Sequence, residues 1–303
     1  MSLLATETFV WQVAHDGFWV FEDPSDHDYV YAEYQGGHIG RINRKTLETK
    51  EIKPFPAVGE KKLRNNWNSP IHISQINKGT IYFGSQFLFR SRDHGDSWER
   101  ISPDLTTNDP AKQKQDESGG LTVDNSDAEA HTTIYTISES PKNGNTVWVG
   151  TDDGNLQVTR NGGQNWTNVV ANVAGLPAHA WVSTIEASRY NEATAYATFD
   201  NHTQGDMKPY VYKTTDYGKT WKPLATADVK GYAHVIKEDT VNRELLFLGT
   251  EFGLFVSVDG GAQWAQFKGG DFTAVAVRDI AVQPRESDLL RSSTNARRQT
   301  RTD

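Results

Sequence analysis

Five carboxylic acids are the side chains of this sequence that could carry out hydrolytic chemistry: Asp16, Asp124, Glu129, Glu139 and Glu186. Each lies near the end of a β-strand that the apolar pattern predicts to be the innermost of its sheet. Hydrolysis of a glycosidic bond uses two carboxyl groups that flank the bond, one as acid and the other as base or nucleophile. Nothing in one sequence pairs any two of the five residues, so each stays a candidate.

Six residues are candidates for ligand binding: Arg64, Trp67, Glu129, His131, Trp181 and His202. Most of them lie in or beside three long loops, at residues 54–69, 102–131 and 200–209. Long loops with little strand pattern are often functional or disordered. If Trp67 and Trp181 are exposed, their rings offer flat faces for a sugar or a peptide. The alternatives are that both rings pack inside the fold and that the histidines are ordinary turn residues.

Common catalytic motifs are absent from the sequence. It contains no G-x-S-x-G elbow and no H-E-x-x-H pair. Asp152-Asp153-Gly154 and residues 124–127 are acidic but lack the spacing of a calcium loop, so we predict solvated turns there. We expect neither a metal site nor a cofactor.

Composition excludes several classes of protein. The 303 residues include no cysteine and have a net charge of −8. The lack of cysteine excludes a disulfide scaffold, a thiol nucleophile and a metal site built on sulfur. The acidic balance argues against nucleic acid as a partner. No apolar run approaches the roughly 18 residues of a membrane span.

An internal repeat is the strongest signal in the chain. Four segments share the pattern S/T-x-D/N-x-G-x-x-W. In such a segment the Asp or Asn side chain accepts backbone hydrogen bonds about two residues on, and glycine supplies the positive φ of a hairpin turn. We interpret the repeated residues as structural: Ser91, Asp93, Gly95, Trp98, Thr159, Asn161, Gly163, Trp166, Thr214, Asp216, Gly218, Trp221, Ser257, Asp259, Gly261 and Trp264.

Short apolar runs before each repeat predict three further strands, so each unit is a four-stranded antiparallel meander of propeller-blade size. The sequence therefore predicts an all-β fold, a β-propeller with about five to six blades, which is an awkward number for a closed ring and is typical of a fragment. The predicted blades span residues 14–53, 68–101, 131–170, 181–225 and 231–268, with a partial blade at 272–290.

The two ends of the chain differ from the rest. Residues 1–5 have no basic stretch before an apolar core and do not form a secretory signal. Residues 291–303 contain four Arg and no large apolar residue. We predict one propeller domain over residues 1–290, followed by a basic, disordered tail.

The repeat is the Asp-box of bacterial neuraminidases. Longer stretches, at residues 67–70, 90–98, 101–106, 147–154 and 209–216, resemble bacterial sortilin-like repeat proteins, which are often described as glycosyl hydrolases. The resemblance covers about residues 8–290. It implies a β-propeller that is exported, to the periplasm or outside the cell, and that belongs to a longer protein.

Two functions follow from these observations. The first is a non-enzymatic binding module whose loops bind a peptide, a protein or a glycan. The second is a glycoside hydrolase, sialidase-like or xyloglucanase-like, with a carboxylate pair at the mouth of the channel. The Arg-Ile-Pro segment typical of the sialidase members does not occur, and fold alone does not decide the function.

Overall fold

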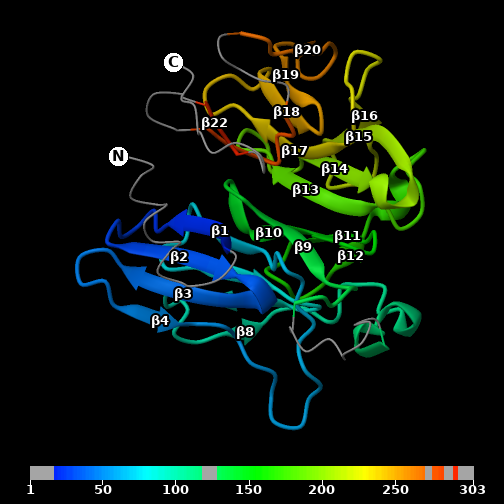
Figure 1. Ribbon diagram of the computed structural model, residues 1–303. Helices are drawn as coiled ribbons and strands as arrows, with labels where there is room; N and C mark the ends of the chain where they lie inside the picture. The colour runs from blue at the N-terminus through cyan, green and yellow to red at the C-terminus, as the bar shows by residue number, and fades with distance from the viewer. Residues whose placement is uncertain (1–16, 118–127, 270–274, 283–288, 293–303) are drawn as a thin grey trace.

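The protein is described by a computed structural model over residues 17–117, 128–269, 275–282 and 289–292. This part of the chain forms five four-stranded antiparallel sheets and one two-stranded sheet. In Figure 1 the sheets follow one another in sequence order, from the blue sheet to the orange one. The predicted fold class is confirmed: the chain is a β-propeller of four-stranded antiparallel blades.

Each blade is a meander in which consecutive strands pair. Blades one and two contain β1 (Gly17–Glu22), β2 (Tyr29–Tyr34), β3 (His38–Asn43), β4 (Thr49–Glu51), β5 (Ile71–Ile73), β6 (Ile81–Gly84), β7 (Leu88–Ser91) and β8 (Glu99–Arg100). Blades three and four contain β9 (Ile134–Ser140), β10 (Asn143–Thr151), β11 (Leu156–Thr159), β12 (Thr167–Asn168), β13 (Trp181–Ala187), β14 (Ala195–Asn201), β15 (Asp206–Thr214) and β16 (Lys222–Pro223). Blade five and the two-stranded sheet contain β17 (Ala233–Glu238), β18 (Leu246–Thr250), β19 (Gly253–Ser257), β20 (Ala265–Gln266), β21 (Asp279–Val282) and β22 (Leu289–Ser292).

Within the described residues, helical structure is limited to short 3-10 turns. They are η2 (Gln35–Gly37), η3 (Pro110–Lys112), η4 (Gln115–Glu117), η5 (Val170–Asn172) and η6 (His202–Gln204). In the ranges that the structure describes, no helix is long and apolar enough to cross a membrane.

From blade two onward, the first strand of each blade lies next to the first strand of the sheet that follows. The backbone N–H of Ile185 donates to Thr136 Oγ1 at 3.3 Å, and that of Ala187 donates to Ser138 Oγ at 3.0 Å. Because the partners advance together along both strands, these inner strands run parallel. Their N-terminal ends therefore meet at one mouth of a central channel, and their C-terminal ends meet at the other.

The hydrophobic core lies between blades. One cluster joins Trp148 in blade three to Phe199 and Trp221 in blade four, and all three side chains are buried. Another joins Tyr196 in blade four to Leu248 and other apolar residues of blade five. Apolar residues on both sheet faces suit this packing, since each blade is covered on two sides.

The four repeated hairpins, in blades two to five, close in the same way. In the first, Gly95 N donates to Ser91 Oγ at 2.8 Å, and Ser97 N donates to Asp93 Oδ1 at 2.8 Å. The Asp93 carboxylate therefore accepts from the backbone N–H four residues further along the chain, whereas the sequence predicted an N–H about two residues further along. Gly95 has φ of 90°, a left-handed conformation that favours glycine.

The hairpins also contact the preceding blade. Trp98 Nε1 donates to the carbonyl of Ile52 at 2.7 Å, and Trp166 Nε1 donates to that of Ile101 at 3.0 Å. A Cβ added to Gly163 would lie 2.4 Å from the same Ile101 carbonyl. Each glycine is thus required for two reasons, a positive φ and a close approach to the neighbouring blade.

Strand β22 includes Arg291 and Ser292, which the sequence assigned to the tail. Residues 293–303 of that predicted tail lie outside the described residues. The predicted outer boundaries of the blades and of the 1–290 domain stay predictions.

Candidate functional site

Three aromatic side chains gather at the mouth formed by the N-terminal ends of the inner strands. Trp67 precedes β5, Tyr135 lies in β9 and Trp181 begins β13, and all three are half-buried. They line a channel of about 730 Å³. The rings of Tyr135 and Trp181 meet edge to face with centroids 5.4 Å apart. We name Trp67, Tyr135 and Trp181 the aromatic mouth.

His131 borders the aromatic mouth beside Trp181, with ring centroids 6.0 Å apart. Its Nδ1 lies 3.4 Å from a carboxylate oxygen of Asp152, which is fully buried. Asp152 also accepts hydrogen bonds from the backbone N–H and the hydroxyl of Thr133. The hydrogen bond to Asp152 raises the pKa of His131 above its usual value, against the effect of burial.

His202 lies on the blade-four side of the channel, in the loop between β14 and β15. Its Nδ1 is 2.7 Å from Asp200 Oδ1, and its ring stacks on Tyr232 with centroids 4.4 Å apart. Both Asp200 and His202 line the channel.

A third histidine completes this side of the mouth. His234 Nε2 lies 3.1 Å from Glu251 Oε2, and Arg278 Nη2 lies 3.6 Å from the same oxygen. Burial lowers the pKa of His234, and the hydrogen bond to Glu251 opposes this. The mouth therefore presents aromatic faces next to three histidine–carboxylate pairs.

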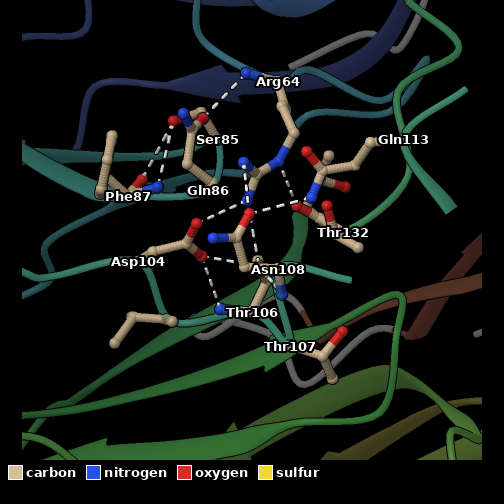
Figure 2. A network of polar contacts seen from close by, with 12 residues as sticks. Arg64, Ser85, Gln86, Phe87, Asp104, Thr106, Thr107, Asn108, Gln113 and Thr132 are labelled. Carbon is tan, nitrogen blue, oxygen red and sulfur yellow. Dashed lines mark hydrogen bonds and ion pairs between the residues drawn. The ribbon is translucent and has the colours of Figure 1, made fainter. Parts of the chain in front are cut away.

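Arg64, three residues before Trp67, lies at the centre of a network of polar contacts (Figure 2). Its guanidinium donates to Asp104 Oδ2 at 2.7 Å, to Thr106 Oγ1 at 3.1 Å and to the carbonyl of Thr132 at 3.0 Å. A further hydrogen bond joins it to Asn108. Arg64 thus ties the segment before Trp67 to both ends of the long connection between β8 and β9.

The candidate acids that the structure describes do not gather at the aromatic mouth. Glu139 and Glu186 lie near the C-terminal ends of β9 and β13, at the opposite end of the channel. Glu186 Oε2 forms an ion pair of 2.7 Å with Lys237 Nζ. Glu129 is exposed. Asp16 and Asp124 lie outside the described residues.

Glu139 is buried between blades two and three. It accepts hydrogen bonds from Tyr82, from Ser74 and from Asn77. Burial raises its pKa, and these hydrogen bonds oppose the rise. A carboxylate with every visible contact inside the protein is a structural element of the blade boundary.

Of the residues predicted from the sequence, Trp67, Trp181, His131 and His202 lie at or beside this mouth. The sequence analysis did not name several of their neighbours: Tyr135, Asp200, Tyr232, His234, Glu251 and Arg278. These neighbours lie in strands or at strand ends, where the alternating pattern of a strand already accounts for a polar or an aromatic residue. Their shared place at the N-terminal start of inner strands, or in the adjoining hairpins, is the signal that could have found them. Within the described ranges, no group of three or more His, Asp or Glu side chains is arranged to hold a metal ion.

Comparison with known proteins gives the fold. No family model matches the chain, and no curated protein matches its sequence. The GH74 xyloglucanase from Xanthomonas campestris is similar in structure, with a TM-score of 0.61 and 17% identity over 89% of this chain and 43% of that one. An ancestral GH74 enzyme has a TM-score of 0.54 and 14% identity over 79% of this chain and 31% of that one.

A third similar structure is the extracellular domain of a protein named as a hybrid two component system, from B. thetaiotaomicron. Its TM-score is 0.57, with 14% identity over 92% of this chain and 31% of that one. The chain spans less than half the length of each of these three structures. At such identities the likeness is one of fold alone, the β-propeller.

Proposed function

We propose that the protein is a binding module that holds a glycan at the aromatic mouth. The observation that carries this proposal is the convergence of Trp67, Tyr135 and Trp181 on one end of a channel of about 730 Å³. The faces of sugar rings carry C–H groups that pack on aromatic rings, whose faces are electron-rich. Pockets with apolar walls and a few convergent polar groups are typical ligand sites.

The polar groups beside the mouth fit the hydroxyls of a sugar. Asp200 and His202 line the channel, and Glu251 lies behind His234. Imidazole and carboxylate groups can both donate to and accept from hydroxyls, depending on protonation. Two of the structurally similar proteins are GH74 enzymes, one of them a xyloglucanase, which supports a glycan over a peptide or a protein as the ligand.

Hydrolysis of the glycan is the second candidate, and the similarity to GH74 enzymes is what favours it. A glycosidase requires a general acid whose pKa is raised next to the bound sugar. Among the described residues the carboxyls with raised pKa include Glu33, Glu139 and Glu238, all of them buried, and Glu139 and Glu238 line the channel only at the end opposite the aromatic mouth. The pKa of Glu251, at the mouth, is lowered, with hydrogen bonds from His234 and Tyr232 opposing the effect of burial. We therefore favour binding without turnover.

The location of the protein and its place in a longer chain are proposals as well. The resemblance to sortilin-like Asp-box proteins, and the extracellular domain among the similar structures, support a location in the periplasm or outside the cell. We propose that the chain is part of a longer propeller protein, in line with its partial coverage of the similar structures.

A binding array that displays glycans and peptides side by side tests the proposal. We expect the wild type to bind glycans, the double variant Trp67→Ala/Trp181→Ala to lose this signal, and Phe252→Ala to keep it. Phe252 is 51% exposed and does not line the channel, so Phe252→Ala removes an aromatic ring without altering the channel and serves as the control. Assay of the bound glycans for released reducing ends separates binding from hydrolysis. Binding of peptides alone would contradict the proposal.

A further inference from the structure

A second cavity, of about 610 Å³, lies between blades two and three, at the end of the molecule opposite the aromatic mouth. Its lining includes Lys78, Arg90 and Arg92 from blade two and Asn143 and Asn145 from the β9–β10 turn of blade three. None of its lining residues is acidic, although the whole chain has a net charge of −8. We name it the basic pocket.

Strand β7 and the turn that follows it supply two of the cations. Arg90 lies in β7, where it pairs with Tyr82 of β6, and Arg92 follows directly after the last residue of the strand. Both arginines line the basic pocket. Two like charges that line one pocket repel each other, which raises the free energy unless an anion lies nearby.

The wall of the basic pocket that belongs to blade three lies close against blade two. A Cβ added to Gly144 would lie 2.4 Å from Asn77 Nδ2. Glycine at this position therefore lets the β9–β10 turn lie against blade two and keeps Asn143 and Asn145 at the pocket edge.

Protein partners neutralise only one of the three cations. Arg90 is nine-tenths buried, and its Nη2 lies 2.9 Å from Glu99 Oε2, yet its buried Nε has no hydrogen-bond partner. Lys78 and Arg92 are exposed, and neither forms an ion pair with another described residue. Glu139 lies beneath the pocket and accepts from Asn77 and Tyr82, so it is already engaged.

We propose that the basic pocket binds an oxyanion, namely the sulfate, phosphate or carboxylate group of a ligand. Guanidinium groups present paired N–H donors that match two oxygens of such a group. Lys78 adds a point charge and Asn145 an amide at the opposite edge. The site does not depend on the aromatic mouth, because the two cavities have no lining residue in common.

Titration with inorganic sulfate, followed by two-dimensional amide NMR at constant ionic strength, tests this site. We expect saturable shifts at the Gly144 and Asn145 amides in the wild type. Lys78→Gln/Arg92→Gln should weaken the affinity at least tenfold. The charge-matched control Lys222→Gln/Arg243→Gln, which alters exposed residues outside the pocket, should leave it within twofold. Unchanged dispersion of the amide spectrum shows that each variant is folded.

Parallel titrations with phosphate and with acetate distinguish the three oxyanion sources by their relative affinities. Trp181→Ala should leave all three affinities unchanged, so the result stands apart from the proposed glycan site. Shifts that do not saturate with any of the anions, or equal weakening in both double variants, would overturn the proposal, because either result means unspecific screening of charge.

Discussion

The hydroxyl of Tyr82, in the second strand of blade two, donates a hydrogen bond of 2.9 Å to Glu139, in the inner strand of blade three. The same contact recurs two blades on, where Tyr196 donates to Glu238 at 3.1 Å. Burial raises the pKa of both carboxyls. The contact joins successive blades and gives them a fixed relative position.

Removal of this hydroxyl should destabilise the protein. In Tyr82→Phe the buried carboxylate of Glu139 loses a donor, which costs about 1–3 kcal/mol in the free energy of unfolding. Urea denaturation checks this, with Tyr210→Phe as the control. Tyr210 donates to Asp206 in a solvent-facing hairpin, so its loss should cost well under 1 kcal/mol. An equal cost for both variants would contradict an interblade role.

The glycine of the repeated hairpin should tolerate no side chain. In Gly163→Ala the added methyl group meets the Ile101 carbonyl at 2.4 Å, and φ is 99°. Gly175 also has a positive φ, of 78°, but a Cβ there meets nothing within 4 Å. Gly175→Ala should therefore cost about 1–2 kcal/mol, the penalty of the left-handed backbone alone. Gly163→Ala should cost at least about 1 kcal/mol more, because overpacking adds to that penalty. An equal decrease in Tm for the two variants would contradict a role for the close approach between Gly163 and the Ile101 carbonyl.

Glu33 should make stability depend on pH. It is buried and accepts from Ser69 N at 3.2 Å, and burial raises its pKa to about 10. The protonated form is favoured in the folded state, so its contribution is fully present below the unfolded pKa of about 4.5 and is lost as pH rises toward 10. Relative to wild type, Glu33→Gln should gain about 1.4 kcal/mol per pH unit between pH 5.5 and 9. The exposed Glu48→Gln is the control, and a flat difference for Glu33→Gln would refute a buried neutral carboxyl.

The histidines of the mouth should titrate in a defined order. The hydrogen bond to Asp152 raises the pKa of His131 above 6.5, and burial lowers that of His234 below 6.5. NMR titration of the imidazole Cε1–H signals, assigned with His131→Gln and His234→Gln, measures both midpoints in one experiment. The reverse order would mean that Asp152 does not contact His131 in solution.

The fold could be predicted from the sequence because its information is local. The pattern from Ser91 to Trp98 contains the complete hairpin, and its four copies set the spacing of the blades. Contacts between blades are not local in this sense. Tyr82 and Glu139 lie 57 positions apart, and neither the tyrosine nor the glutamate differs in type from a solvent-facing strand residue.

Part of the candidate site could be proposed from the sequence because its residues stand out locally, and the rest could not because it depends on contacts between blades. Trp67 and Trp181 stand outside the repeated pattern, which marks them for a different role. Tyr135 and His234 fall within regular strands, so only the ring of parallel inner strands brings them to the mouth. Arg64 is conspicuous in the sequence for its charge, yet the partners of its guanidinium in Figure 2 come from a loop about 40 to 70 residues away, which no spacing rule connects.

Isothermal titration of the glycan that binds best on the array, with the wild type and with Trp181→Ala and Phe252→Ala, tests the central claim most directly. A ring that stacks on the sugar contributes about 1–3 kcal/mol, so Trp181→Ala should weaken the affinity about fivefold or more while Phe252→Ala leaves it unchanged. Wild-type affinity in Trp181→Ala would contradict a glycan site at the aromatic mouth.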